Sequence, residues 1–474
     1  MRKQFCCILL IALGILGLSS ASFAQSSEVQ SLMERARAGN DQAQFDLGWA
    51  YYKGKGIAQN YTEAMYWWRR VADKTGDAVA QSNVGLLYRD GKGVTQDFAK
   101  ARYWYQLSAN QGEPLGQNGL GLLYMEGEGV PQNYDTARRW IKRAANQGLA
   151  GAEANMGNIY SFGTGVSIDN AKAVYWYKRA AAQGNTQAQY NLANHLANGE
   201  GVTQNYAEAL RLYTLAAKSG YAEAQHNLAN MYFDGRGGRQ DYTAAMMWYK
   251  RAAEQGSTMS QYEVGSMYAK GFGVTKDLNI ARSWFERSAK GGYAVAQEAM
   301  AGMTYKGSGG SKDLAESFRW YSLAASAGRP YAQFSLGYLY EYGEGTAVDY
   351  GKAASWYERA ADQGDIDAQY RLAIFYAEGK GVSKNNEKAR HLYEKAAKEG
   401  HDGAQLNLGY MYLEGAGVKD LVTAYMWLSI ALNNWNDLGY DDWKELGDRL
   451  SDDQKKEAGR KVEAWIKANP KCCY

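Results

Sequence analysis

The chain has 474 residues, with 54 glycines but only 4 prolines, and it contains 38 tyrosines and 14 tryptophans. Charged residues make up 22% of the chain and the formal net charge is +3, without a long run of one sign. This composition excludes a disordered or coiled-coil chain, and it does not favour nucleic acid or an anionic membrane as a partner.

The first 24 residues have the pattern of a secretory signal peptide. Basic residues at positions 2 and 3 precede an apolar run from Cys6 to Leu18, and a small-x-small cleavage pattern ends at Ala24. The apolar run is shorter than the roughly 20 residues that a membrane span needs, and no later segment is apolar enough to span. We therefore predict cleavage after Ala24 and a periplasmic or secreted protein.

Disulfide bonds are not expected to hold the fold together. Cys6 and Cys7 lie in the predicted signal peptide, and the mature chain keeps only Cys472 and Cys473 near the terminus. Neighbouring cysteines close a minimal loop and add little stability, so the fold must depend on packing. The two thiols are either solvated or crosslink to another chain in an oxidising compartment.

A repeat of 36 residues occupies most of the chain. Each unit contains a small marker residue in an "LG" or "LA" pair, followed six and eight residues later by two glycines. Apolar residues between the glycines recur at helical spacing, which predicts helix A, a glycine turn, helix B and a glycine stop in every unit. The markers are Gly48, Gly85, Gly121, Gly157, Ala193, Ala229, Gly265, Ala301, Gly337, Ala373 and Gly409.

An asparagine or aspartate stands just before helix B in every unit. These residue types are preferred helix N-caps, because the side-chain oxygen accepts a hydrogen bond from a backbone N–H that has no partner within the helix. The predicted caps are Asn60, Asp97, Asn133, Asp169, Asn205, Asp241, Asp277, Asp313, Asp349, Asn385 and Asp420.

The repeated pattern reads AQ-x-x-LG-x-x-Y-x-x-G-x-GV-x-x-D-[YF]-x-x-A-x-x-WY-x-x-AA-x-QG, from about Gly39 to Trp435. It resembles the Sel1-like repeat family, relatives of the tetratricopeptide repeats. The resemblance implies an all-α solenoid, a right-handed superhelix of about eleven helix-turn-helix repeats with terminal capping helices. It also implies an interaction scaffold, like the periplasmic regulators, exopolysaccharide assembly factors and host-association proteins of that family.

One repeat cannot bury enough apolar surface alone, so neighbouring repeats must stack and the two ends of the array need caps. We predict an N-terminal capping helix within residues 25–40 and eleven repeats over residues 41–435. Capping helices and a tail follow over residues 436–474, where Ser451 and Gln454 have the spacing of a capping box.

Helix A lines the concave side of tetratricopeptide superhelices, and by that alignment three positions around each marker face a partner. Asparagine recurs one residue after the marker in three successive repeats, and such an amide ladder offers donors and acceptors to an extended peptide. Nearby aromatic side chains add contact area at low rotamer cost. The alternative is a solvated polar face without a ligand. The candidate partner-binding residues are Trp49, Asn158, Tyr190, Asn194, His226, Asn230, Tyr262 and Tyr338.

No catalytic, cofactor or metal site is predicted. His195 and His226 lie in adjacent A helices but five positions apart in register and without a cysteine beside them, which is not a zinc-ligand spacing. The turn Gly91-Lys92-Gly93 lacks the third glycine and the preceding strand of a dinucleotide fingerprint, so it is interpreted as a turn.

Three functions remain, in decreasing order of preference. The first is an exported, noncatalytic scaffold that binds a protein or an extended peptide segment through its concave helix-A face. The second is a binder of cell-wall or exopolysaccharide glycan, because aromatic rings stack on sugars and amides bind hydroxyls. The third is a β-lactam-binding or β-lactam-hydrolysing enzyme, although the family branch linked with that activity carries paired cysteines that these repeats lack.

Overall fold

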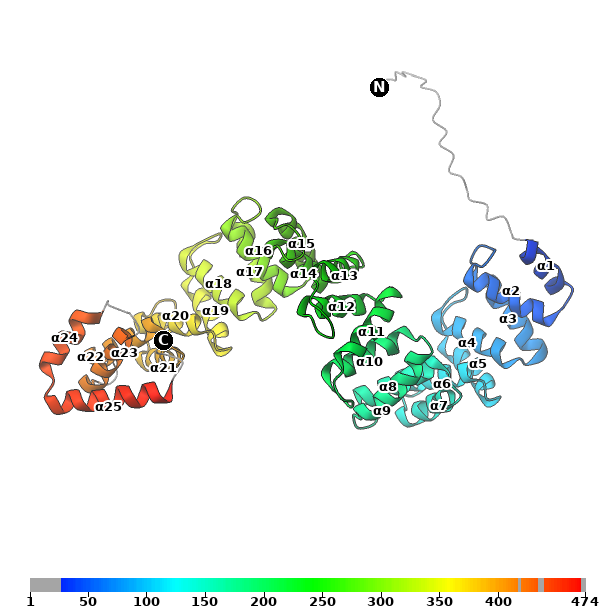
Figure 1. Cartoon of the computed structure of the whole chain (residues 1–474), viewed down its shortest axis with the longest axis horizontal. Coiled ribbons are helices and arrows are strands. Elements are labelled where there is room, and N and C mark those ends of the chain that lie inside the picture. The colour runs from blue at the N-terminus through cyan, green and yellow to red at the C-terminus, as the bar shows by residue number, and fades with distance from the viewer. Residues whose placement is uncertain (1–26, 417–418, 434–438, 470–474) are drawn as a thin grey trace, which may run out of the picture. The chain divides into compact units, whose positions relative to one another are not determined.

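The structure is a computed structural model that describes residues 27–416, 419–433 and 439–469. These residues form 25 α-helices and no β-strand, which confirms the predicted all-α class (Figure 1). The predicted signal peptide, Cys472 and Cys473 lie outside the described residues. The chain divides into two compact units, Met1–Ser219 and Gly220–Tyr474.

The first unit contains one leading helix and five helix pairs, which are repeats 1 to 5. Helix A comes first in each pair and helix B second, and within this unit each helix packs against the next one along the chain. The helices are α1 (Ser27–Arg37), α2 (Asp41–Lys53), α3 (Tyr61–Thr75), α4 (Ala78–Asp90), α5 (Phe98–Asn110), α6 (Pro114–Glu126), α7 (Tyr134–Asn146), α8 (Ala150–Phe162), α9 (Asn170–Ala182), α10 (Thr186–Asn198) and α11 (Tyr206–Lys218).

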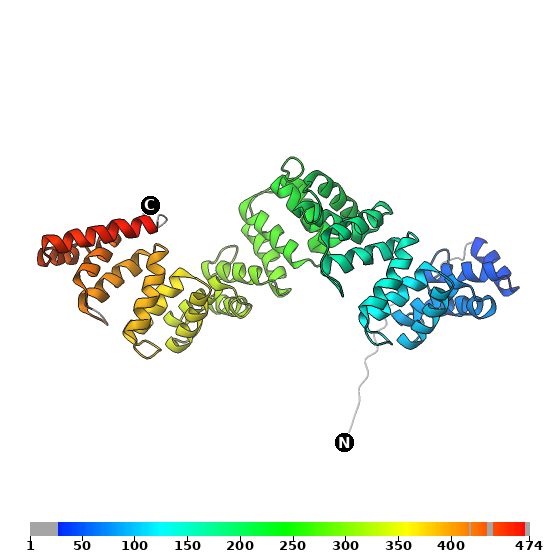
Figure 2. The same cartoon turned by 90° about the horizontal axis from the view of Figure 1, so that it is seen from below.

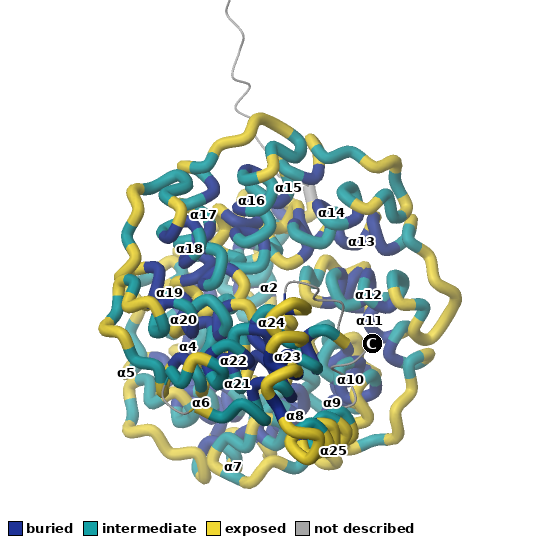
Figure 3. Tube along the Cα trace, turned by 90° about the vertical axis from the view of Figure 1, so that its left-hand side faces the viewer, coloured by how far each residue is buried: buried dark blue, intermediate teal, exposed yellow. Residues whose placement is uncertain are grey.

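The second unit contains six further pairs, which are repeats 6 to 11, and two closing helices. Within both units buried residues lie along the helices and exposed residues gather in the connecting loops (Figure 3). The helices are α12 (Ala222–Asp234), α13 (Tyr242–Glu254), α14 (Thr258–Lys270), α15 (Leu278–Lys290), α16 (Ala294–Lys306), α17 (Leu314–Ser326), α18 (Pro330–Tyr342), α19 (Tyr350–Asp362), α20 (Ile366–Glu378), α21 (Asn386–Lys398), α22 (Asp402–Glu414), α23 (Leu421–Asn433), α24 (Tyr440–Arg449) and α25 (Asp452–Ala468).

All eleven predicted caps at the start of helix B are confirmed. The side-chain oxygen of each accepts a hydrogen bond from a backbone N–H in the first turn, as Asp97 accepts from Lys100 at 2.9 Å and Asp420 accepts from Thr423 at 3.0 Å. Because these caps recur, every helix B begins at the same place in its repeat.

The glycines serve two different physical purposes. Gly112, at the end of helix B, has a φ of 88° and open space around its Cα, so only its left-handed backbone requires glycine. Gly93, in the turn after α4, has a φ of 71°, and a Cβ there would lie 2.3 Å from the backbone carbon of Tyr61. The second turn glycine therefore lets each loop rest directly on helix B of the preceding repeat.

The small marker residue lets helix A lie close to helix B. A Cβ on Gly157 of α8 would lie 2.4 Å from the ring of Tyr177 on α9, a residue that is almost fully buried. In each repeat with a glycine marker, a large apolar or aromatic side chain of helix B fills this space, and it is an isoleucine, phenylalanine or leucine where it is not a tyrosine or tryptophan.

Glutamine side chains form hydrogen bonds near the helix ends in many repeats. Gln147, after α7, donates from Nε2 to Oε1 of Gln117 at 2.9 Å and to the carbonyl oxygen of Gly112 at 3.0 Å. A second kind of contact is seen at Gln261 of α14, which donates to the carbonyl oxygen of Ala253, at the end of the preceding helix B, at 3.1 Å. These bonds satisfy terminal carbonyl groups that have no partner within their own helix.

Repeat 4 departs from this arrangement, because Glu153 replaces the glutamine. Its carboxylate accepts a hydrogen bond from Gln183 at 2.7 Å and forms an ion pair with Arg179, also at 2.7 Å. The Glu153 side chain is 1% exposed, whereas that of Arg179 is 35% exposed. The buried carboxylate is thus compensated both by an ion pair and by an amide donor.

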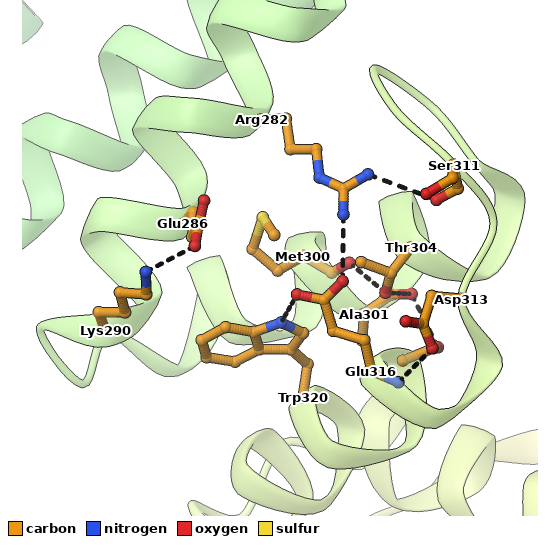
Figure 4. A network of polar contacts seen from close by, with 11 residues as sticks. Arg282, Glu286, Lys290, Met300, Ala301, Thr304, Ser311, Asp313, Glu316 and Trp320 are labelled. Atoms are coloured by element: carbon orange, nitrogen blue, oxygen red, sulfur yellow. Dashed lines mark hydrogen bonds and ion pairs between the residues drawn. The ribbon is translucent and has the colours of Figure 1, made fainter. Parts of the chain in front are cut away.

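An additional polar network joins repeats 7 and 8 (Figure 4). Arg282 of α15 donates to Glu316 of α17 at 3.1 Å and to the carbonyl oxygen of Ser311 at 3.5 Å. The other carboxylate oxygen of Glu316 accepts from Nε1 of Trp320 at 3.3 Å. The network ties two successive B helices and the intervening loop together.

The ends of the array are covered by helices. Gln44 of α2 donates to the carbonyl oxygen of Ala36 in α1 at 2.9 Å, which repeats the contact between successive repeats. At the other end α25 lies alongside the last repeat (Figure 2), and the rings of Trp427 and Trp465 meet edge to face at 5.5 Å. The capping box predicted at Ser451 is present at the start of α25.

Candidate functional site

The three predicted ladder asparagines each accept a hydrogen bond from a core tyrosine of their own repeat. Oδ1 of Asn158 accepts from the Tyr177 hydroxyl at 2.7 Å and from the Asn191 side chain of the next repeat at 3.0 Å. Asn194 and Asn230 each accept from a tyrosine hydroxyl as well. These amides therefore hold helix A to helix B.

The equivalent contacts join Tyr213 to Asn194 in the first unit and Tyr249 to Asn230 in the second. In each case the tyrosine hydroxyl on helix B donates to the side-chain oxygen on helix A. Sequence reasoning missed this role, although the tyrosine and the asparagine recur 19 residues apart in the three repeats. A continuous ladder over the three repeats stays a prediction.

Trp49 and Tyr190 are half-buried rather than projecting freely. Trp49 packs edge to face on Trp68 at 5.3 Å and lines a cavity of about 770 Å³ between α1 and α2. Tyr190 lies 6.0 Å from the ring of Tyr213. Both rings contribute to packing and leave part of their surface open to a ligand.

His226 lies on α12, the helix A of repeat 6, in the second unit. Its Nδ1 lies 2.9 Å from the Ser260 hydroxyl of the next repeat, and its ring lies 5.6 Å from Tyr249. Burial lowers the pKa of His226 below its ordinary value of 6.5, because the protonated ring loses solvation. The histidine is therefore a neutral hydrogen-bonding group between two repeats at neutral pH.

Tyr262 and Tyr338 lie together in one groove of the second unit, which we call the helix-A groove. It has a volume of about 470 Å³, within the range of roughly 300–1,000 Å³ that is typical of ligand sites. It is formed by α14, α16 and α18, with one ring from α17. The lining residues are Tyr262, Val295, Glu298, Ala299, Gly302, Tyr305, Lys306, Tyr321, Arg329, Tyr331, Phe334, Ser335, Tyr338 and Leu339.

The floor of the helix-A groove is formed by small residues and one buried ring. Gly302 stands one residue after its marker, the position that carries asparagine in repeats 4 to 6. Beneath it lies Tyr321, which is 5% exposed and whose pKa is raised by burial. The Tyr321 hydroxyl interacts with the side chains of Ser335 and Tyr331.

Two charged groups in the wall are paired with each other. Arg329 donates to both carboxylate oxygens of Glu298, at 3.1 and 3.0 Å. The nearby Glu344 carboxylate, together with burial, raises the pKa of Tyr305 to about 12, so its hydroxyl stays protonated at neutral pH. The groove thus combines aromatic surface with one compensated ion pair and the exposed side chain of Lys306.

The described residues contain no group of three or more His, Cys, Asp or Glu side chains placed to hold a metal ion. Among the same residues, none of the helices combines the length and the apolar character that a membrane span requires.

The repeats were compared with known protein families and with solved structures. A search among curated protein sequences gave no match. The Sel1 repeat pattern matches eleven times and follows the helix pairs of both units. The matched residues are 41–75, 78–113, 114–149, 150–185, 186–221, 222–257, 258–293, 294–328, 330–365, 366–401 and 403–434.

Two solved structures share both sequence and fold with the chain. A protective antigen of uropathogenic Escherichia coli strains that displays an SLR fold is 33% identical, with a TM-score of 0.76, over 93% of this chain and 95% of that one. A Sel1 repeat protein from Oxalobacter formigenes is 32% identical, with a TM-score of 0.53, over 66% of this chain and 90% of that one. Sel1 repeat proteins commonly serve as noncatalytic scaffolds that bind other proteins. Because eleven repeats match the family pattern and two solved relatives are more than 30% identical, the chain belongs to the Sel1 repeat family.

Proposed function

We propose that the protein is an exported, noncatalytic scaffold that binds a protein or an extended peptide segment along the concave helix-A face. The observation that carries the proposal is the helix-A groove, where three successive A helices present aromatic rings around an open space. Aromatic anchors in a concave site supply much of the binding energy of typical protein interfaces. The scaffold role of the family supports the same conclusion.

Export to the periplasm or the exterior is supported by the pattern of residues 1–24, with its basic start, short apolar run and cleavage pattern at Ala24. The antigenic character of the Escherichia coli relative agrees with a protein that leaves the cytoplasm. Mass spectrometry of the protein recovered from cell fractions tests this, and a mature chain beginning at Gln25 is the expected result. A cytoplasmic chain that retains Met1 would refute it.

In-cell photocrosslinking tests the binding face. A photoreactive residue replaces Tyr262 or Tyr338 of the groove, and captured material is identified by mass spectrometry. We expect the same protein partner from both positions, because both side chains line one space.

Matched controls carry the same photoreactive residue at Met247 or Leu323, which are exposed on helix B, with exposures of 43% and 50%. They should capture little of that partner. Equal capture from the helix-B positions, or none from the groove, would show that the helix-A face is not the binding surface.

A glycan of the cell wall or of an exopolysaccharide is the second candidate, and the tyrosine-rich lining of the groove favours it, because sugar rings stack on aromatic faces. Retention of the protein on purified peptidoglycan or polysaccharide, reversed by soluble sugar, would promote this candidate over the first. Failure of soluble sugar to compete would remove it.

A further inference from the structure

The helix-A groove lies where earlier repeats fill the same space with paired amides. In repeats 4 and 5, Asn158 accepts from Tyr177 and from Asn191. Four repeats of 36 residues further along the chain, Gly302 and Ser335 stand in the places of the two asparagines. One amide is thus replaced by a hydrogen atom and the other by a hydroxymethyl group, which opens a space above the equivalent tyrosine, Tyr321.

Neither packing nor backbone conformation requires glycine at position 302. A Cβ there would have only the Tyr321 hydroxyl near it, at 3.9 Å, which is an ordinary contact. Gly302 lies inside α16 and its φ is not positive, whereas glycine in a helix interior costs about 1 kcal/mol relative to alanine. The glycine therefore lowers the stability of the helix, and what it provides is the open space above Tyr321.

The walls of this space are aromatic. Tyr305 rises from α16, and Phe334 and Tyr338 from α18, while Tyr331 is 56% exposed at the rim. The Phe334 ring is held 5.7 Å from the buried Tyr357 ring, and Tyr338 lies 4.5 Å from Tyr342. Rings that are held in place by packing favour another ring, through edge-to-face or offset contacts.

The paired charges of the groove wall favour a guest that leaves them undisturbed. Glu298 and Arg329 are joined by two hydrogen bonds, while Lys306, the other charged residue of the lining, is exposed. A sugar hydroxyl that bonds to Glu298 or Arg329 would have to displace these internal hydrogen bonds, which is unfavourable. An aromatic side chain leaves them intact and gains apolar contact.

We propose that the helix-A groove takes one aromatic side chain of an extended partner segment, seated over Gly302 and Tyr321. The inference rests on the proposed function, because it names the chemistry by which the scaffold anchors its partner. Neighbouring positions of the helix-A face then contact the flanking residues of the segment.

The variant Gly302→Asn tests the inference. It introduces the side chain found at the same position in repeats 4 to 6, and the introduced amide would meet Tyr321 as Asn158 meets Tyr177. We expect a folded protein with a closed groove. Ser266→Asn, at the same position of repeat 7 and outside the lining, is the matched control.

The probes are N-acetyl-L-tryptophanamide and N-acetyl-L-tyrosinamide, with N-acetyl-L-alaninamide and methyl α-glucopyranoside for comparison. Saturation-transfer NMR should detect binding of the two aromatic amides to the wild type and to Ser266→Asn, and at least a tenfold weaker binding to Gly302→Asn. Tyr331→Ser, at the exposed rim, should weaken binding severalfold without affecting folding.

Equal binding of the aromatic amides to the wild type and to Gly302→Asn would overturn the inference, as would binding of the glucoside alone. These failures are distinct from failure of the proposed function. The scaffold proposal fails when the wild type captures no partner through Tyr338, whereas the aromatic-anchor proposal fails when closing the groove leaves probe binding unchanged.

Discussion

The hydroxyl of Tyr177 on α9 donates a hydrogen bond of 2.7 Å to the side-chain oxygen of Asn158 on α8. The same oxygen accepts from Asn191 at 3.0 Å, so one amide joins the two helices of its repeat and the first helix of the next. Stability within a helical-repeat array depends on such contacts between neighbours.

The first prediction concerns this contact. Tyr177→Phe removes the donor alone and should lower the free energy of unfolding by ~1 kcal/mol, whereas Asn158→Ala removes the acceptor of a buried hydroxyl together with the contact to Asn191 and should cost ~1–3 kcal/mol. Urea unfolding followed by circular dichroism measures both. Tyr103→Phe, at a ring that is 57% exposed, is the control and should change nothing. Equal stability of all three variants would contradict the role assigned to Asn158.

The second prediction separates the two kinds of glycine. Gly112→Ala introduces only the strain of a positive φ, about 1–2 kcal/mol. Gly93→Ala introduces a similar strain and in addition a clash with the backbone of Tyr61, which should add ~1–3 kcal/mol. Thermal unfolding of the two variants should therefore show a clearly larger loss for Gly93→Ala. The reverse order would refute the close approach of the loop to the preceding helix B.

The third prediction concerns the buried carboxylate of repeat 4. Glu153→Gln restores the side chain found in the other repeats and keeps an acceptor for Gln183, while the released Arg179 can be solvated. Stability should change by less than about 1 kcal/mol, because a buried ion pair adds little net stability.

Glu153→Ala, the matched comparison, leaves Gln183 without its partner and should cost ~1–3 kcal/mol in the same unfolding assay. If Glu153→Gln were as damaging as Glu153→Ala, the ion pair with Arg179 would be essential to the repeat, contrary to this expectation.

The fourth prediction concerns pH. Nδ1 of His401 caps α22 by accepting from Ala404 at 3.1 Å, and burial lowers the pKa of His401 below its ordinary 6.5, although Asp367 and Asp402 oppose the shift. A lowered pKa in the folded state means that stability is present above about pH 6.5 and is lost as pH falls through the folded value. His226 contributes in the same direction.

His401→Asn keeps an N-cap acceptor without a titrating group, so its loss of stability between about pH 7.5 and about pH 5.5 should be smaller than that of the wild type. The control is His391→Asn, at an exposed position, which should follow the wild type. Urea midpoints at the two pH values measure the difference. Identical pH dependence in all three proteins would refute the role of His401.

The fifth prediction concerns the C-terminal cap. Deleting Ser451–Tyr474 removes α25 and exposes the rings and aliphatic groups around Trp427 on α23. An uncovered last repeat should aggregate, since terminal repeats need a polar outer face. Light scattering and thermal melting report the result, and a monomeric protein with an unchanged melting profile would contradict it.

The sequence predicted the repeated elements well because each boundary has a local physical cause. Asp97 and the other ten caps accept backbone N–H groups within their own turn, and the turn glycines adopt positive φ for reasons that lie within a few residues. The spacing of apolar residues every three or four positions then identifies the helices. None of these features depends on a distant part of the chain.

The site was harder to predict, because which side chains are free to bind a partner depends on contacts between helices. Asn158 was interpreted as a ligand contact, yet its oxygen is engaged by Tyr177 and Asn191, which lie 19 and 33 residues away. Of the helix-A groove, the sequence analysis predicted Tyr262 and Tyr338 but not the part of the glycine at position 302 or the serine at position 335. Their combined effect appears once α16, α17 and α18 are packed together.

Hydrogen–deuterium exchange of the full-length protein, with and without the partner captured by crosslinking, is the sharpest test of where that partner binds. We predict that the partner protects amides in and around α14, α16 and α18, while α13 and α15 exchange as they do in the free protein. Protection confined to the B helices, or an exchange pattern that the bound partner leaves unchanged, would rule out binding at the helix-A groove.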